Sequence, residues 1–216
     1  MQLRAERLAW IFGLACLAIW GAANLAGIGG ARQDLERFEA LRASSSQLTQ
    51  PLPESRSPDL SLWDIKRVHA WRDTLTRPAP PPLAILRIAR INLEVAVLPG
   101  TDDFVLNRAV GHITETALPG ADGNSGLAGH RDGFFRGLKD IAPGDRIEVE
   151  TLKDRQVYQV DRVWTVAPED VSVLDPTPIQ SLTLVTCYPF YFVGPAPQRF
   201  IVRAVRAKAE LRVPGG

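Results

Sequence analysis

Cysteine is scarce in this chain, with two among 216 residues. Cys16 lies inside an apolar run, where it is most simply a small apolar residue. Cys187 is therefore the only cysteine in the rest of the chain, which excludes a disulfide framework. In an exported protein a leftover cysteine indicates either an intermolecular bridge or a reactive thiol.

A concentrated basic face is also missing. Lysine and arginine number 25 against 24 aspartates and glutamates, so the formal net charge is +1, and no block of basic residues occurs. Nucleic-acid binding requires such a face, and we expect no nucleic-acid partner. The chain has no internal repeat, and its length predicts about one to two domains.

One long hydrophobic run is present, "LAWIFGLACLAIWGAANLAGI" at residues 8–28, with Asn24 as its only clearly polar side chain. A helix needs about 20 such residues to cross a bilayer. Arg4 and Arg7 precede the run, so the positive-inside rule predicts a cytoplasmic N-terminus and a single-pass anchor, with the remainder outside. A cleaved signal peptide is the alternative, since residues 29–31 are small, but the length of the run favours an anchor.

Composition divides the chain into four parts. Residues 1–30 are the predicted cytoplasmic tip and anchor, and residues 31–82 a stalk and linker that includes the Ser- and Pro-rich "SSSQLTQPLPESRSP". Residues 83–210 are the predicted β-rich domain, and residues 211–216 a tail.

The linker contains one predicted amphipathic helix, "SLWDIKRVHAWRDTL". Its apolar residues recur at spacings of three and four: Leu62, Ile65, Val68, Trp71 and Leu75. We expect this helix to pack on the following domain, with His69 at its surface. The sequence "RPAPPP" then ends it.

From Leu83 onward the chain changes to short alternating runs, which predict strands. Two predicted strands lie on either side of Asn92, and two more on either side of the polar turn at Lys153 and Asp154. Another is "GNSGLAGHRD", which ends at His130, and the last two are "SLTLVTCY" and "RFIVRAVRA". Two brief helical stretches are expected, "TDDFVLNRAV" with Thr101 as N-cap, and "FFRGLKDI". The predicted fold class is all-β, a barrel or a sandwich.

A nucleophilic thiol needs a neighbour that lowers its pKa, and a donor for the oxyanion that forms on a carbonyl. The available histidines are His69, His112 and His130. His130 follows the small residues of "GNSGLAG" and is favoured as the partner of Cys187, whereas His112, beside a turn, is interpreted as structural. Asp132 either orients His130 or faces water, and both alternatives stay open.

Two arginines follow Cys187 on the last strand. Arg199 and Arg203 are four residues apart and share a strand face, and Arg199 lies nearer the preceding loop. Several aromatic residues either line the site or pack in the core: Trp164, Tyr188, Phe190, Tyr191 and Phe192.

Several separated motifs resemble those of the sortase family. "TLVTC", ending at Cys187, is followed twelve residues later by Arg199 in "PQRFIV", which resembles the TLxTC…R signature of sortases. "ILRIARINLEVAVLPGTD" resembles the first strands of the sortase domain. "GHITETALPGADGNSGLAGHRD" resembles its histidine region, in which the second histidine is catalytic. The resemblance covers residues 83–207. Within the family, the chain looks most similar to class D or Gram-negative-type sortases.

The resemblance implies an eight-stranded β-barrel and a membrane-anchored cysteine transpeptidase. Such enzymes cleave a C-terminal LPxTG-like sorting signal of a secreted protein and transfer the acyl group to an amine, of a peptidoglycan precursor or a pilin lysine. By motif, Cys187 is the nucleophile that forms a thioester, His130 the general acid or base, and Arg199 the donor to substrate and oxyanion. Thr186 supports the strand and contributes to substrate binding. No cofactor is expected, because no acidic spacing here reproduces a calcium loop.

Two other functions remain as alternatives. One is a different exported cysteine acyl-transferase, such as an L,D-transpeptidase, but that family places its histidine close before its cysteine, and here His130 and Cys187 are far apart in sequence. The other is a non-catalytic barrel that binds a partner at the cell surface, and it predicts that Cys187→Ala leaves function intact.

Overall fold

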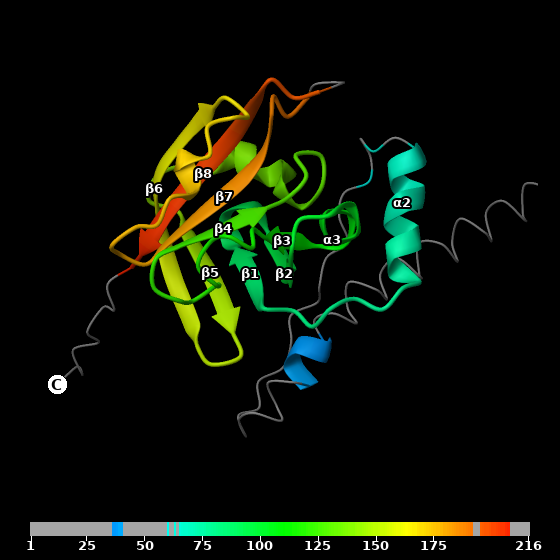
Figure 1. Ribbon diagram of the computed structural model, residues 1–216, viewed down its shortest axis with the longest axis horizontal. Coiled ribbons are helices and arrows are strands. Elements are labelled where there is room, and N and C mark those ends of the chain that lie inside the picture. Colours follow the sequence, from blue (N-terminus) through cyan, green and yellow to red (C-terminus); the bar gives the residue numbers. More distant parts are fainter. Residues whose placement is uncertain (1–35, 41–59, 61–62, 64, 192–194, 208–216) are drawn as a thin grey trace, which may run out of the picture.

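Eight strands close into a barrel in the computed structural model, which describes residues 36–40, 60, 63, 65–191 and 195–207 (Figure 1). The strands are β1 (Ala84–Ile88), β2 (Leu93–Pro99), β3 (Val110–His112), β4 (Asn124–Ala128), β5 (Arg146–Thr151), β6 (Arg155–Val166), β7 (Ser181–Tyr188) and β8 (Gln198–Arg206). Their order around the barrel is β1-β2-β3-β4-β7-β8-β6-β5, and β5 closes on β1. The predicted all-β class and the eight-stranded barrel are confirmed.

Most neighbouring strands are antiparallel, but β2 pairs with β3 and β4 pairs with β7 in parallel. The strands predicted on either side of Asn92 are present as β1 and β2. Asn92 has a φ of 53°, in the left-handed region that asparagine tolerates better than most residues.

Short helices connect the strands: α3 (Asp103–Arg108) and the 3₁₀ turns η1 (Ala89–Ile91), η2 (Phe134–Asp140) and η3 (Ser172–Leu174). The helix expected after Thr101 exists, but its N-cap is Asp102, whose carboxylate accepts a hydrogen bond from the Val105 amide at 2.9 Å. The pattern also missed β3, which has only three residues, too few for an alternation to be visible.

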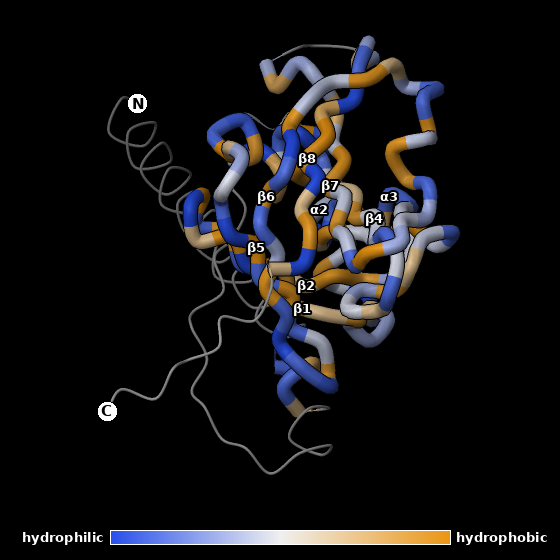
Figure 2. Tube along the Cα trace, turned by 90° about the vertical axis from the view of Figure 1, so that its left-hand side faces the viewer, coloured by the Kyte–Doolittle hydropathy of each residue, from blue (hydrophilic) through white to orange (hydrophobic). Residues whose placement is uncertain are grey.

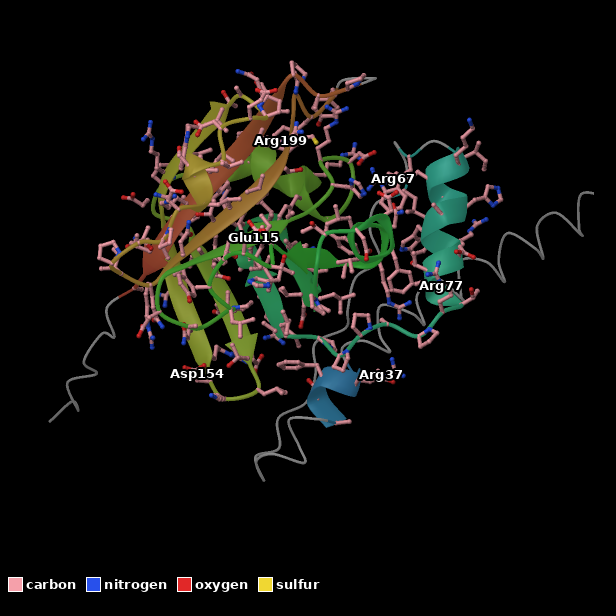
Figure 3. All side chains as sticks on the ribbon, viewed as in Figure 1. Arg37, Arg67, Arg77, Glu115, Asp154 and Arg199 are labelled. Atoms are coloured by element: carbon pink, nitrogen blue, oxygen red, sulfur yellow. The ribbon has the colours of Figure 1, made fainter. Side chains whose placement is uncertain are left out.

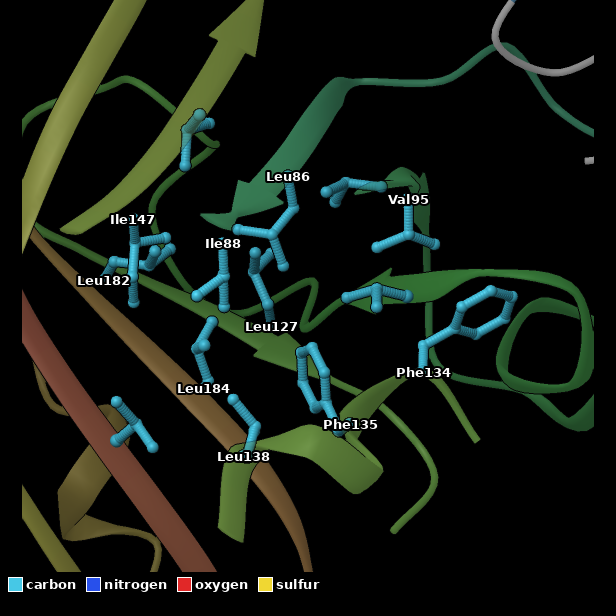
Figure 4. Close-up of a cluster of buried hydrophobic side chains, with 14 of the residues drawn as sticks. Leu86, Ile88, Val95, Leu127, Phe134, Phe135, Leu138, Ile147, Leu182 and Leu184 are labelled. Atoms are coloured by element: carbon cyan, nitrogen blue, oxygen red, sulfur yellow. The ribbon is translucent and has the colours of Figure 1, made fainter. Parts of the chain in front are cut away.

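Strand alternation directs one face of each strand into the core. Leu182 and Leu184 on β7 are fully buried, and hydrophobic segments, in orange, lie along β2 (Figure 2). The core contains aliphatic side chains from the strands together with Phe134, Phe135 and Leu138 of η2, which closes over them (Figure 4). Burial of each such side chain stabilises the fold by about 1.5–3 kcal/mol.

Helix α2 (Ile65–Leu75) stands beside the barrel next to α3 (Figure 1). Trp71 and Thr74 are its buried residues, at 3% exposure each, whereas Ile65 is 67% exposed. The predicted helix is therefore confirmed, but the expectation that Ile65 faces the domain is wrong, because the buried stripe runs through Trp71 and Thr74.

A helical segment at residues 36–40 places Phe38 against Ile85 of β1, and both side chains are buried. The predicted anchor at residues 8–28 and the Ser- and Pro-rich linker stretch at residues 44–58 lie outside the described residues. Among those that are described, no helix has the length and apolarity that a membrane crossing requires.

Candidate active site

The free thiol of Cys187 lies on the outer face of the barrel, near the end of β7. Strand alternation explains this orientation, since Leu184 and Thr186 point inward and are buried, while Val185 and Cys187 are partly exposed. Cys187 is paired in register with Arg199 on the antiparallel strand β8. Directly opposed side chains share one sheet face, so the guanidinium and the thiol emerge side by side.

His130 reaches the same place from β4. Strands β4 and β7 run parallel with Ala128 opposite Val185, and the Gly129 amide extends the pairing by donating to the Val185 carbonyl at 3.2 Å. Two residues further along each chain are His130 and Cys187, so the register places them level with each other. The prediction that β4 reaches His130 is wrong by two residues, because pairing ends at Ala128.

Two buried threonines of the "TLVTC" motif connect β7 to β4. Thr186, 2% exposed, donates its hydroxyl to the Gly129 carbonyl at 2.7 Å, immediately before His130. Thr183, fully buried, donates to Asn124 Oδ1 at 2.7 Å, and Asn124 in turn donates to the Val173 carbonyl at 3.1 Å. The Thr186 hydroxyl is thus committed to the strand that leads to the histidine.

Arg199 is held at the start of β8. Its Nη1 donates to the carbonyls of Ala196 and Gln198, at 3.3 and 3.2 Å. Figure 3 shows Arg199 at the end of the barrel where a loop joins β7 to β8. Arg203 instead donates to the Val173 carbonyl at 2.6 Å and is opposite Thr183 in register. Of the two arginines, Arg199 is the one beside the thiol.

The other histidines have different surroundings. His112 on β3 is 3% exposed, and its Nε2 lies 3.0 Å from the Ala117 carbonyl and 3.2 Å from Thr116 Oγ1. This is a satisfied structural histidine, as expected. His69 is exposed on α2.

The protonation of His130 is controlled by its surroundings. The pKa of the imidazole is lowered from 6.5 to about 4, chiefly by burial and also by the positive charge of Arg67 on α2, while Asp103 on α3 acts in the opposite direction. The imidazole is therefore neutral at neutral pH and can accept a proton from a thiol.

Asp132 pairs with a residue that neither expected alternative included. Its carboxylate forms an ion pair with Arg67 Nη1, and its backbone carbonyl accepts a hydrogen bond from Trp63 Nε1. Sequence reasoning missed Arg67 and Trp63 because they precede the β-rich domain by about twenty residues. The hydrophobic spacing of the helix predicts that it packs, but not which polar residue it brings to the site.

The aromatic residues after Cys187 form a packed group. Tyr188, Phe190 and Phe200 have ring centroids 5.1–6.0 Å apart, and Phe190 and Phe200 contact the core. Tyr191 is 68% exposed, and Phe192 lies outside the described residues.

Trp164 on β6 is partly buried between two guanidiniums, with Arg162 4.7 Å and Arg203 5.7 Å from its ring centroid. Its register partner on β8 is Ile201, one step from Arg199 on the same face. Within the described residues no cluster of three or more metal-ligating side chains occurs.

A thiol, a neutral imidazole and a guanidinium brought to one end of the barrel can supply the nucleophile, the base and the oxyanion donor of acyl transfer. The family model for the sortase domain matches residues 86–207. The chain belongs to the sortase family, and the predicted resemblance is confirmed.

Similar proteins include members of two sortase classes. Sortase D of Bacillus subtilis is 34% identical over 123 residues, which cover 56% of this chain and 62% of that protein. The alignment thus spans less than two thirds of this relative. A sortase D5 transpeptidase of Clostridium perfringens shares the fold, with a TM-score of 0.61 at 24% identity over 83% of this chain and 99% of that one. Sortase E1 of Streptomyces coelicolor, solved with a tripeptide in the active site, is 35% identical with a TM-score of 0.53, over 61% of this chain and 92% of that one.

Proposed function

We propose that the protein is a membrane-anchored cysteine transpeptidase. It cleaves an LPxTG-like signal near the C-terminus of a secreted protein and transfers the acyl group to an amine, of a peptidoglycan precursor or a pilin lysine. The observation that carries the proposal is the register of β4, β7 and β8, which gathers His130, Cys187 and Arg199 at one end of the outer barrel face.

The first half of the proposed reaction forms a thioester. Neutral His130 takes the thiol proton while the Cys187 sulfur attacks the scissile carbonyl. The oxyanion that develops is stabilised by the Arg199 guanidinium, which is always charged and offers several fixed donors. When the tetrahedral intermediate collapses, the peptide C–N bond breaks, and His130 returns the proton to the leaving amine.

The second half transfers the acyl group. An acceptor amine attacks the thioester carbonyl and gives a proton to His130, and the Cys187 sulfur leaves and recovers a proton. An unpaired thiol suits this cycle, because a second cysteine nearby would trap it as a disulfide.

A peptide substrate is supported by the comparison with Streptomyces coelicolor sortase E1, whose active site holds a tripeptide. The proposed location is the outer side of the cell membrane, with residues 8–28 as a single-pass anchor. In intact cells a membrane-impermeant thiol reagent should then label Cys187. Labelling only after lysis would contradict this location.

The central experiment uses the full chain in detergent, incubated with LPxTG-type peptides and an amine acceptor. We expect a thioester adduct on Cys187 by mass spectrometry and an amide product that depends on the amine. Cys187→Ala is the control and should give neither. The proposal fails if no peptide of a library gives thioester or product while the thiol reacts with iodoacetamide and the fold is intact.

The same control addresses the alternatives. A non-catalytic barrel would keep its surface function in Cys187→Ala, whereas a transpeptidase loses it entirely. An L,D-transpeptidase is disfavoured by the sortase-domain match and would transfer peptidoglycan stem peptides rather than sorting signals.

A further inference from the structure

An arginine from outside the matched sortase domain contacts the histidine loop. Arg67 lies on the side of α2 that faces the barrel (Figure 3) and forms an ion pair with Asp132, two residues after His130. The side chains of this pair are 14% and 31% exposed, so the pair is partly shielded from water. The family match begins only at residue 86.

Trp63 completes the contact. Its side chain is 8% exposed, and its Nε1 donates to the Asp132 carbonyl. The Arg67 guanidinium carbon lies 4.2 Å from the Trp63 ring centroid, and the Trp63 ring meets Trp71 edge to face at 6.1 Å. The backbone and side chain of Asp132 are therefore both held by residues that precede the barrel.

Gly133 shows how closely this contact fits. A Cβ at Gly133 would lie 3.1 Å from Arg67 Nη2, 3.4 Å from the Trp63 ring and 3.5 Å from His130 Cβ. The space between this loop and the residues before the barrel thus leaves little room for a side chain, directly beside the histidine.

The helix that carries Arg67 is itself fixed to the domain at its other end. Arg108 on α3 donates to the Thr74 carbonyl of α2 at 2.5 Å, and the Arg77 guanidinium lies 4.6 Å from the Phe104 ring centroid. Because α2 packs along α3, the helix that carries Arg67 cannot move away from Asp132 without loss of these contacts.

We propose that Arg67 is a positioning residue of the reaction, which acts through Asp132 to hold the loop that places His130 level with Cys187. This inference rests on the proposed function of the site. The loop needs such support, because His130 lies beyond the last paired residue of β4, where no strand pairing restrains it.

The charge of Arg67 has a second effect. The charged groups that act on His130 come from two helices, Arg67 from α2 and Asp103 from α3, and burial reinforces the effect of Arg67. On β7 the facing group is Cys187, and the neighbouring Arg131 directs Nη1 to the Pro189 carbonyl at 3.1 Å. Loss of the Arg67 charge should raise the pKa of His130, so that the imidazole becomes protonated at a higher pH.

The test compares four full-length variants by their dependence of kcat/KM on pH. Arg67→Gln should lower kcat by about 10- to 100-fold with little change in KM, and should move the acid limb of the profile to higher pH. Arg67→Lys, which keeps the charge, should retain the acid limb. Asp132→Asn, which breaks the ion pair but keeps Arg67, should lower kcat while the limb stays. Lys66→Gln, which removes a charge from an exposed neighbour on the same helix, should behave as wild type.

A second readout does not depend on catalysis. In the same variants, the ring resonances of His130, identified by their loss in His130→Gln, should titrate at a higher pH in Arg67→Gln than in wild type or Lys66→Gln. If Arg67→Gln titrates and turns over as wild type, the positioning role is refuted. If Arg67→Gln does not fold, the Asp132→Asn and Arg67→Lys variants provide the test. An unchanged kcat in both of them would also refute the positioning role of Arg67. If the His130 titration shifts in Arg67→Gln but the wild-type protein processes no peptide, the proposed function is refuted. The effect of the Arg67 charge on the pKa of His130 is then still supported.

Discussion

The two halves of the site are built differently. Cys187 and Arg199 lie opposite each other on two hydrogen-bonded strands of a closed barrel, so backbone pairing sets their relation. His130 follows the end of β4, and its place depends on side-chain bonds: Thr186 to Gly129, Arg131 to Pro189, and Arg67 to Asp132. The thiol half should therefore tolerate neighbouring substitutions, whereas the histidine half should lose activity when any of its side-chain supports is removed.

The largest difference is expected between two histidines. His130→Ala should lower kcat/KM by about 10²–10⁴-fold with little change in unfolding temperature, because it removes the general acid and base. His112→Ala should instead cost about 1–3 kcal/mol of stability, since the partly buried Ala117 carbonyl loses its partner, and activity per folded molecule should persist. Kinetics and thermal unfolding of both variants check this. A loss of activity in His112→Ala alone would reverse the assignment of the histidines.

The arginine of the thiol half is tested next. Arg199→Lys should lose about 10²–10³-fold in kcat while stability is nearly unchanged, because an ammonium cannot reproduce the fork of donors. Arg203→Lys is the matched control and should keep most activity, since Arg203 serves the Val173 carbonyl. Equal activity of Arg199→Lys and wild type would move the oxyanion role to Arg203 or to backbone amides.

Two buried threonines separate positioning from stability. Thr186→Val and Thr183→Val each remove one buried hydroxyl, and each should destabilise the fold by about 1–3 kcal/mol in urea unfolding. Only Thr186→Val should also lower kcat, by about tenfold, because only Thr186 bonds the residue next to His130. If both variants lost activity equally, the histidine half would not depend on this bond specifically.

The smallest expected effect concerns the dependence of kcat/KM on pH, which should be nearly flat between pH 7 and about pH 5.5. With a His130 pKa of about 4, kcat/KM should stay nearly constant from neutral pH down to about pH 5.5. A histidine with the ordinary pKa would retain only about a tenth of its neutral form there. A midpoint near 6.5 in the measured profile would show that the imidazole is not shielded as the structure has it.

The same lowered pKa makes the fold sensitive to acid. Because the folded protein binds the His130 proton more weakly than the unfolded chain, this group's contribution to stability is complete above pH 6.5 and is lost as the pH falls to about 4. The free energy of unfolding of wild type and His130→Gln should be measured along this pH range. It should decline less steeply with falling pH in the variant. Parallel curves would argue against a neutral, buried imidazole.

Much of the barrel was predictable from the sequence, because a strand with one buried face alternates apolar and polar residues. The strands β5 to β8 lie where the sequence predicted them, with β5 and β6 on either side of the predicted polar turn at Lys153 and Asp154. The three-residue strand β3 was not predictable, since its role comes from parallel pairing with β2, which leaves no local signal. The cap of α3 was misassigned because Thr101 and Asp102 are both good capping residues, and backbone geometry selects Asp102.

The candidate site divides in the same way. The sequence by itself determined that Cys187 is the only cysteine outside the apolar run, and its resemblance to the sortase motifs predicted His130 and Arg199 as the partners of that thiol. Only the tertiary structure decided the role of Asp132, which pairs with Arg67 rather than His130. The physical reason is that this contact joins residues 65 positions apart, and it depends on how α2 packs along α3, which no local pattern encodes.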